Sequence, residues 1–276
     1  MANDYVHGYD AQAHGRLRDQ AAALAPLLHP PSDRTFEPTS DLLEIGCGVG
    51  AQTAQLIARH PGIRITALDV DPGSVVAAQA WATDAGHENV TFRTGDVYAL
   101  PFTDRTFDHV FVCFLLEHLA DPEGALRALS RVLKPGGTIT AIEGDHGSAR
   151  FHPDNADARA AIDCQVALQA RAGGDATLGR RLYPLLRRAG LDEVRVSPRL
   201  VYIDGSRPAL ADAFTRSTFT AMVAAVRGRA LGERLIDAQR FDAGVRALER
   251  TAEQDGVFCY TFFKATATVP SRAPSD

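Results

Sequence analysis

The sequence has 276 residues, of which 23% are charged and 45% hydrophobic, and its formal net charge at pH 7 is −5. This length is enough for one large domain, or for a domain with a sizeable insertion, around an ample hydrophobic core. The acidic balance argues against extended contact with nucleic acid, which requires a basic face.

The sequence also argues against a membrane protein and a metal centre. No apolar run approaches the roughly 20 residues of a membrane-spanning helix, and residues 1–5 lack the basic-then-apolar order of a signal peptide. The cysteines are far apart, without the paired spacing of metal ligands, at Cys47, Cys113, Cys164 and Cys259. We therefore expect a cytoplasmic protein with reduced thiols, no membrane contact and no metal site.

Apolar periodicity divides the chain into alternating elements. Residues 6–28 give a helical pattern, and the Pro- and Ser-containing stretch 29–40 predicts a linker. Beyond it, we expect strands at 42–45, 63–68, 90–93, 108–114, 138–142, 194–202 and 257–268. Helices are expected at 51–58, 73–85, 123–133, 157–171 and 178–189, with a helical block at 208–252. Such alternation predicts an α/β fold with a mostly parallel sheet and helices on both faces.

The alternation breaks in two places, at about 144–177 and 204–252. We expect these insertions to form a helical cap over the carboxyl edge of the sheet, within a main domain at 41–268. Residues 1–40 would form an N-terminal helix and linker that could act as a lid, and the tail 269–276 is expected to be disordered.

The first predicted strand runs into a glycine turn, Gly-Cys-Gly-Val-Gly at 46–50, and the second strand ends on Asp69. A strand, a glycine turn, a helix and a second strand that ends in an acid form half of a nucleotide site. The G-x-G-x-G spacing leaves a dinucleotide open, because Ala51 could take the last position of that fingerprint. Glu44 favours a ligand without phosphate and with an amino-acid head, since a carboxylate there would repel a pyrophosphate and could orient an ammonium.

Further motifs follow the turn in a fixed order. They are Leu-Glu-Ile-Gly-Cys-Gly-Val-Gly at 43–50, Ala-Leu-Asp-Val-Asp-Pro at 67–72, Thr-Gly-Asp-Val at 94–97, Phe-Asp-His-Val at 107–110, Phe-Leu-Leu-Glu-His-Leu at 114–119 and Leu-Ser-Arg-Val-Leu-Lys-Pro-Gly-Gly at 129–137. In this series, which covers about residues 41–143, the chain resembles the class I S-adenosylmethionine (SAM)-dependent methyltransferases. Leu-Leu-Arg-Arg-Ala-Gly-Leu at 185–191 and the last strand match further on.

The resemblance implies a Rossmann-like, doubly wound, mostly parallel seven-stranded sheet whose last strand is antiparallel. It implies SAM as the cofactor and methyl transfer to an O, N or C atom of a small-molecule acceptor, such as a secondary metabolite or another hydrophobic metabolite. The group it resembles most acts on quinone precursors and many small metabolites.

The family's cofactor site can be carried over onto the matching positions. The glycines would let the backbone approach the methionine part of SAM, Asp69 would bind both ribose hydroxyls, and Asp96 would bind the adenine amino group. Phe114 and Leu115 would line the methyl region. The implied cofactor-binding residues are Glu44, Gly46, Cys47, Gly48, Gly50, Asp69, Val70, Asp96, Val97, Phe114 and Leu115. Helix capping is the alternative role for Asp69 and Asp96.

Candidate catalytic residues follow the fifth strand, at the edge where ligands bind in doubly wound sheets. His146 carries an imidazole that can act as a general base, and Glu143 or Asp145 could orient it. The alternative is a polar loop. Tyr9, in the aromatic N-terminal segment, could lie near the methyl group if that segment closes over SAM; otherwise the segment is a helix docked on the sheet.

The helical block 208–252 is rich in apolar side chains, namely Phe214, Phe219, Met222, Phe241 and Leu248. This stripe predicts ordinary helix core, an apolar pocket for the acceptor, or a contact between copies in a homo-oligomer. Two other functions remain open: a SAM-fold protein with a non-methylating reaction or a binding role, and an NAD-dependent oxidoreductase.

Overall fold

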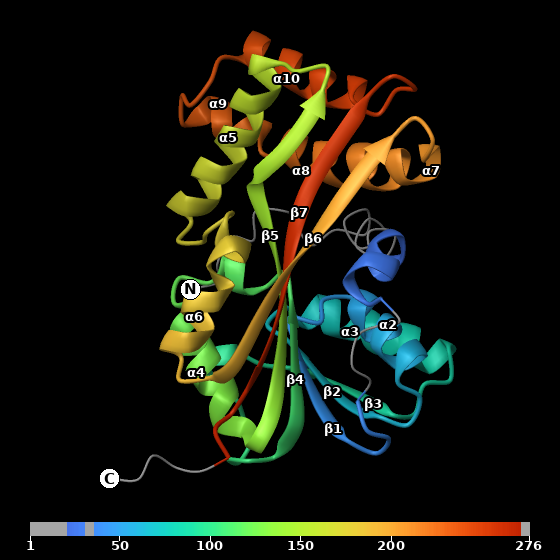
Figure 1. Cartoon of the computed structure of the whole chain (residues 1–276), viewed down its shortest axis with the longest axis vertical. Helices are drawn as coiled ribbons and strands as arrows, with labels where there is room; N and C mark the ends of the chain where they lie inside the picture. Colours follow the sequence, from blue (N-terminus) through green and yellow to red (C-terminus); the bar gives the residue numbers. More distant parts are fainter. Residues whose placement is uncertain (1–20, 31–35, 272–276) are drawn as a thin grey trace.

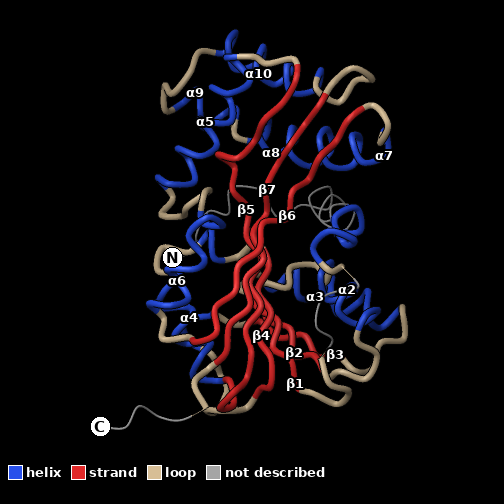
Figure 2. The backbone as a smooth tube through the Cα atoms, viewed as in Figure 1, coloured by secondary structure: helices blue, strands red, loops and turns tan. Residues whose placement is uncertain are grey.

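A computed structural model describes residues 21–30 and 36–271. In this part of the chain, seven strands form one sheet in the order β3-β2-β1-β4-β5-β7-β6 (Figures 1 and 2). Strands β1 to β5 pair in parallel, and β7 is antiparallel to both β5 and β6, which confirms the predicted topology. The strands are β1 (Asp41–Ile45), β2 (Arg64–Asp69), β3 (Val90–Thr94), β4 (Phe107–Cys113), β5 (Leu133–His152), β6 (Asp192–Asp204) and β7 (Val257–Thr268).

Helices cover both faces of the sheet, as the alternation predicts. Helices α2 (Ala51–Arg59) and α3 (Pro72–Asp84) lie on one face, whereas α4 (Pro122–Val132) and α6 (Leu182–Arg188) lie on the other (Figure 1). Short 3-10 helices lie in the connections between these elements. They are η1 (Val97–Ala99) after β3, η2 (Leu116–His118) after β4 and η3 (Leu178–Arg181) before α6. Aspartate side chains cap the N-termini of α3 and α4: Asp71 and Asp121 each accept a hydrogen bond from the backbone N–H of the residue three positions later.

Alternation along the central strands divides the core into two layers. In β4, Val110 and Val112 pack in the cluster that contains α4 and α6, whereas Phe111 and Cys113 pack in the cluster that contains α2 and α3. A strand covered on both faces buries successive side chains in opposite directions, so both layers are apolar.

The fifth strand is much longer than the sequence predicts. It pairs with β4 only as far as Ile142, and from Glu143 to His152 it pairs with β7 alone, with a register shift between Asp145 and Arg150. The predicted polar loop at 143–148 is therefore wrong: this segment is strand. Its Gly and Asp residues disfavour a strand locally, but pairing with β7 overrides that preference and the irregular register accommodates them.

The remaining helices gather around the extended ends of β5, β7 and β6, beyond the carboxyl ends of β1 and β4 (Figure 1). They are α5 (Ala156–Arg171), α7 (Pro208–Leu210), the π-helix η4 (Ala211–Thr220), α8 (Ala221–Ala225), α9 (Arg227–Gly232) and α10 (Ala238–Arg250). Phe214, Phe219, Phe241 and Leu248 are buried in the core, and Met222 packs against it, which confirms the interpretation as helix core. The boundaries given for the domain and its insertions stay predictions.

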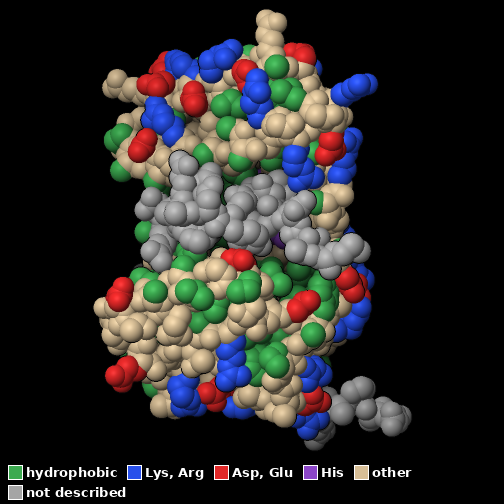
Figure 3. All heavy atoms as spheres, turned by 180° about the vertical axis from the view of Figure 1, so that it is seen from behind, with side chains coloured by type: hydrophobic (Ala, Val, Ile, Leu, Met, Phe, Trp, Pro, Cys, Tyr) green, Lys and Arg blue, Asp and Glu red, His purple; other side chains and the backbone are tan. Residues whose placement is uncertain are grey.

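Surface charge is mixed on the face seen in Figure 3, where basic and acidic side chains are interspersed in both halves of the molecule. Among the described helices, none combines the length and apolar character needed to cross a membrane. The N-terminal segment with Tyr9 and most of the predicted disordered tail lie outside the described residues.

The close contact between α5 and α10 depends on Gly244. A Cβ atom on Gly244 would lie 2.3 Å from the carbonyl oxygen of Asp157 and 3.0 Å from Ala161 Cβ. We expect Gly244→Ala to lower the free energy of unfolding by about 1–3 kcal/mol, because α10 must move away from α5. Urea denaturation measures the change.

Gly228, in α9, is the matched control, because no atom lies within 4 Å of the Cβ position there. Gly228→Ala is expected to be neutral or to stabilise by up to about 1 kcal/mol through helix propensity. Equal effects of the two substitutions would contradict close packing of α10 on α5.

Candidate functional site

The glycine turn joins β1 to α2 at the carboxyl edge of the sheet. Gly46, Gly48 and Gly50 have φ values of 74°, 51° and 79°, in a backbone region that residues other than glycine rarely adopt. The N–H groups of Gly46 and Cys47 both donate to the carbonyl oxygen of Leu68, at 2.8 and 3.0 Å. These bonds fix the turn beside the end of β2.

The three glycines face different surroundings. A Cβ on Gly46 would lie 3.2 Å from the Leu115 side chain, and one on Gly50 would lie 3.2 Å from the Trp81 ring. A Cβ on Gly48 would meet nothing within 4 Å. Gly46 and Gly50 therefore allow close packing, whereas the turn is open at Gly48, where a ligand can approach the backbone.

Asp69, at the end of β2, binds the turn directly. Its Oδ2 accepts the N–H of Gly48 at 2.7 Å, and its Oδ1 accepts the N–H of Asp71 at 2.9 Å. Burial raises the pKa of Asp69 despite these hydrogen bonds. The cap of α3 is Asp71, so Asp69 does not have the alternative capping role. Asp96 does cap a helix, because it accepts the Tyr98 N–H of η1 at 2.9 Å.

Glu44, in β1 just before the turn, is 2% exposed. Its Oε2 accepts a hydrogen bond from Thr53 Oγ1 at 2.7 Å. Burial, with a smaller contribution from the charge of Asp69, raises the pKa of Glu44 to about 8, although the Thr53 bond opposes the shift. A positive group bound nearby would favour the ionised carboxylate.

The other residues of the predicted cofactor site lie around the same edge. Phe114 and Leu115 follow β4, and the contact between Leu115 and Gly46 brings their loop against the glycine turn. Val70 is largely exposed after Asp69, and Val97 is buried after Asp96. Cys47 is buried in the turn, and burial raises the pKa of its thiol, so it is not a reactive nucleophile. All four cysteines are free thiols, as predicted.

Glu143, which we expected to orient His146, has another role. Its Oε1 accepts the N–H groups of Leu116 and Leu115 at 2.8 and 3.2 Å, and its Oε2 accepts that of Glu117 at 3.4 Å. The carboxyl group is fully buried, and burial raises its pKa to about 8. It therefore fixes the loop after β4.

Asp145 also does not orient His146. Its carboxylate binds the Arg180 guanidinium through two hydrogen bonds, of 2.8 and 2.5 Å. The expectation that Glu143 or Asp145 orients the imidazole is wrong, because the extended β5 turns these side chains toward other partners.

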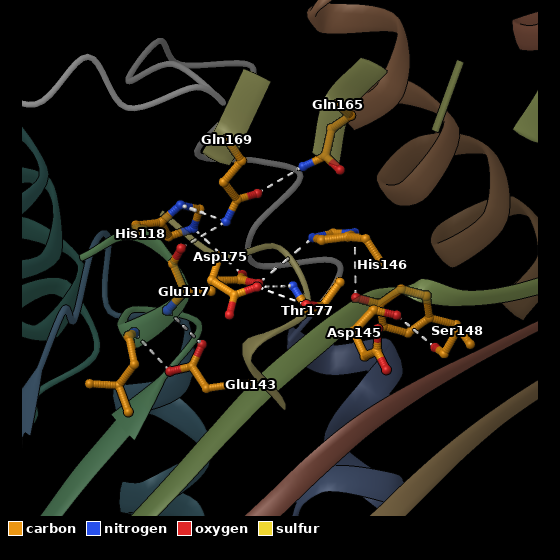
Figure 4. Close-up of polar contacts among 12 residues, drawn as sticks. Glu117, His118, Glu143, Asp145, His146, Ser148, Gln165, Gln169, Asp175 and Thr177 are labelled. Atoms are coloured by element: carbon orange, nitrogen blue, oxygen red, sulfur yellow. Dashed lines mark hydrogen bonds and ion pairs between the residues drawn. The ribbon is translucent and has the colours of Figure 1, made fainter. Parts of the chain in front are cut away.

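The carboxyl group that faces His146 belongs to Glu117 (Figure 4). Glu117 Oε2 lies 3.7 Å from His146 Nε2, and Glu117 Oε1 lies 3.5 Å from His118 Nε2. On the other side of the ring, the Tyr260 hydroxyl lies 3.4 Å from His146 Nδ1. Sequence reasoning missed this role of Glu117, although its position directly after β4, next to the methyl-region residues, is a signal that could have found it.

In residues 21–30 and 36–271, no group of three or more His, Cys, Asp or Glu side chains could hold a metal ion. Tyr9 lies outside the described residues.

A doubly wound sheet with a glycine turn after β1 and a carboxylate at the end of β2 defines a Rossmann-like protein. Comparison with known proteins identifies the family. The family described as "Methyltransferase domain" matches residues 43–141. Demethylmenaquinone methyltransferase of Thermus thermophilus is 30% identical over 161 residues, 48% of this chain and 73% of that protein. The chain belongs to the class I SAM-dependent methyltransferases, whose cofactor is SAM.

Other relatives match over shorter parts of their length. Norajmaline N-methyltransferase of Rauvolfia serpentina is 35% identical over 142 residues, 51% of this chain and 47% of that protein. The chain spans about half the length of several curated relatives that it matches. Among solved structures, the [4+2]-cyclase SpnF shares the fold, with a TM-score of 0.53 and 23% identity, over 98% of this chain and 86% of that one.

The buried Glu44 carboxyl predicts a pH dependence of stability. Its pKa in the folded protein is about 8, above the 4.5 of an exposed glutamate. Its contribution to stability is therefore fully present below pH 4.5 and is lost as the pH rises through 8, by at most about 1.4 kcal/mol per pH unit for one proton. We expect Glu44→Gln to make the decline of unfolding free energy between pH 5 and pH 8 shallower.

Denaturant titrations at several pH values measure this effect. Glu88→Gln, at an exposed glutamate, is the control and should keep the wild-type slope. A Glu44→Gln profile parallel to that of the wild type would show that Glu44 does not hold a proton in the folded protein.

Proposed function

We propose that this protein transfers the methyl group of SAM to a small-molecule acceptor at the carboxyl edge of the sheet. The contact between Gly46 and Leu115 carries the proposal, because it brings the glycine turn against the loop that leads to Glu117 and His146. Two sequence relatives are named as methyltransferases of small molecules, demethylmenaquinone and norajmaline, which supports the same class of acceptor.

The residues present fit SAM. The open side of the turn at Gly48 leaves room for the methionine part, and the buried Glu44 carboxyl suits its ammonium group. Asp69 would accept two hydrogen bonds from the ribose hydroxyls, and charged acceptors make such bonds stronger. Asp96 and Val97 would contact the adenine, with Val70 beside the ribose. When bound, SAM supplies an electrophilic methyl group on its sulfonium.

His146 is the proposed general base for the acceptor. Its side chain is 6% exposed, and its Nε2 faces the Glu117 carboxyl. Glu117 would stabilise the imidazolium that forms when His146 takes a proton from the acceptor. Glu143 would act indirectly, as a positioning residue, by holding the loop that carries Glu117 and the methyl-region residues Phe114 and Leu115.

Aromatic side chains border the base and support a hydrophobic acceptor. The His146 ring lies 5.7 Å from the Tyr260 ring and 6.1 Å from the Phe219 ring, measured between centroids. Phe114 lies 5.1 Å from Phe262 by the same measure. Apolar walls with a few polar groups are typical of sites for small organic ligands.

Family membership excludes the NAD-dependent oxidoreductase. The fold alone does not specify methyl transfer, since the fold neighbour SpnF is named as a [4+2]-cyclase. Formation of S-adenosylhomocysteine from SAM separates the proposed function from a non-methylating reaction and from a binding role. A protein that binds SAM tightly but yields no S-adenosylhomocysteine with any metabolite fraction would contradict the proposal.

Asp69 provides a direct test of the cofactor site. Asp69→Asn is expected to weaken SAM binding about 10- to 100-fold, because one charged acceptor of two ribose hydrogen bonds is lost. Isothermal titration calorimetry measures the dissociation constant. Asp84→Asn, at an exposed position near the end of α3, is the control. An unchanged affinity in Asp69→Asn would remove Asp69 from the ribose site.

His146 provides the matching test of catalysis. His146→Ala and His146→Gln are expected to lower turnover at least about tenfold, within the usual contribution of a general base, while SAM affinity stays nearly unchanged. His152→Gln, an exposed residue on the same strand, is the control. Full activity of both His146 variants would remove this histidine from the mechanism.

A further inference from the structure

The strongest unexplained feature of the site is the Glu117 side chain. It is 7% exposed, and its Oε2 has no hydrogen-bond donor among the described residues. The only ion-pair contacts recorded for it in this part of the chain are with His118 and His146, and both exceed ordinary hydrogen-bond length. A buried acceptor without a donor destabilises a protein by about 1–3 kcal/mol, so Oε2 is suited to a donor that a ligand brings.

A second acceptor comes from α5, where two buried amides form a chain of hydrogen bonds. Gln169 Nε2 donates to the backbone carbonyl of Glu117 at 3.0 Å, and Gln165 Nε2 donates to Gln169 Oε1 at 2.9 Å. Because a carbonyl can only accept, this chain fixes the orientation of both amides. It leaves Gln165 Oε1 buried and without a donor among the described residues.

The hydrogen bonds of Gln169 connect this amide chain to Glu117, whose carboxyl group faces His146. In Figure 4, Gln165 and Gln169 reach from α5 toward the part of the fold where β4 and β5 present Glu117 and His146. We propose that the methyl acceptor is an amine that enters as an ammonium, and that Glu117 Oε2 and Gln165 Oε1 accept its N–H groups. This inference rests on the proposed function and names its class of acceptor.

Charge favours an ammonium over other donors. Burial, with smaller contributions from the charges of Glu143 and Asp175, raises the pKa of Glu117 well above its usual range, because the ionised form is unfavourable there. A cation bound beside Glu117 would favour the ionised carboxylate, so the carboxyl group releases its proton to solvent as the ammonium binds. The aromatic rings of Phe219 and Tyr260 that flank His146 also attract cations. A phenol or alcohol offers one donor and no charge, and a carbon nucleophile offers neither.

An ammonium must lose a proton before it can attack a methyl group. One proton passes from the ammonium nitrogen to Nε2 of a neutral His146, which becomes an imidazolium facing the Glu117 carboxylate. The nitrogen keeps the lone pair of the broken N–H bond and is then a neutral nucleophile. Glu117 thus binds the cationic acceptor first and the imidazolium afterwards.

Matched pairs of amines and alcohols test the inference. The probes are 2-phenylethylamine against 2-phenylethanol, tryptamine against tryptophol, and cyclohexylamine against cyclohexanol. Binding to the full chain saturated with S-adenosylhomocysteine is measured by calorimetry. We expect at least one amine to bind about tenfold tighter than its alcohol, the effect of one charged hydrogen bond.

Variants locate the preference at Glu117. Glu117→Gln is expected to reduce the ratio of the two affinities to about twofold or less, with S-adenosylhomocysteine affinity unchanged. Glu249→Gln, at an exposed glutamate of α10, should keep the wild-type ratio. If Glu117→Gln does not fold, Gln165→Leu takes its place and should weaken amine binding.

Two results would overturn the inference: no amine that binds better than its alcohol, or an amine preference that survives in the folded variants. In each case, intact S-adenosylhomocysteine binding together with methyl transfer to another acceptor would leave the proposed function standing. Loss of cofactor binding and of all transfer would instead refute the proposed function itself.

Discussion

The hydrogen bonds from the loop after β4 to the buried carboxyl group of Glu143 hold the site together. Three successive backbone N–H groups, those of Leu115, Leu116 and Glu117, point at this one side chain. Because the loop is fixed there, Leu115 lies against Gly46 and the Glu117 side chain faces His146. The proposed cofactor side and the proposed acceptor side of the site would therefore share one anchor, Glu143 on β5.

The length of β5 explains how the region proposed to hold the acceptor is built. Its first half pairs with β4 and belongs to the parallel sheet, whereas its second half pairs with β7 beyond the carboxyl edge. The helices packed around this extension bury Phe214 and Phe219, and they bring Gln165 and Gln169 toward the end of β4. A single continuous strand thus carries the positioning residue Glu143 and the proposed base His146 at a fixed separation.

Sequence alone predicted the parts of the fold that local patterns encode. Apolar periodicity predicted the strands and helices of the main sheet, and the ordered motifs indicated the family. The extension of β5 was not predictable, because Gly144, Asp145 and Gly147 disfavour a strand and only pairing with the distant β7 makes it one. That error displaced the candidate partners of His146, since a loop would have let Glu143 or Asp145 turn back toward it. Sequence reasoning missed the role of Glu117, because contacts between strands β4 and β5 determine what its side chain faces.

The central claim is that one edge of the sheet holds the SAM donor next to the Glu117 and His146 pair. A crystal structure of the complex with S-adenosylhomocysteine tests it most directly. The account predicts the ribose on Asp69, the amino-acid part over the turn at Gly48, and the sulfur directed toward the loop after β4 and the pair Glu117 and His146. A ligand whose ribose lies away from Asp69, or whose sulfur is turned away from that pair, would contradict the account.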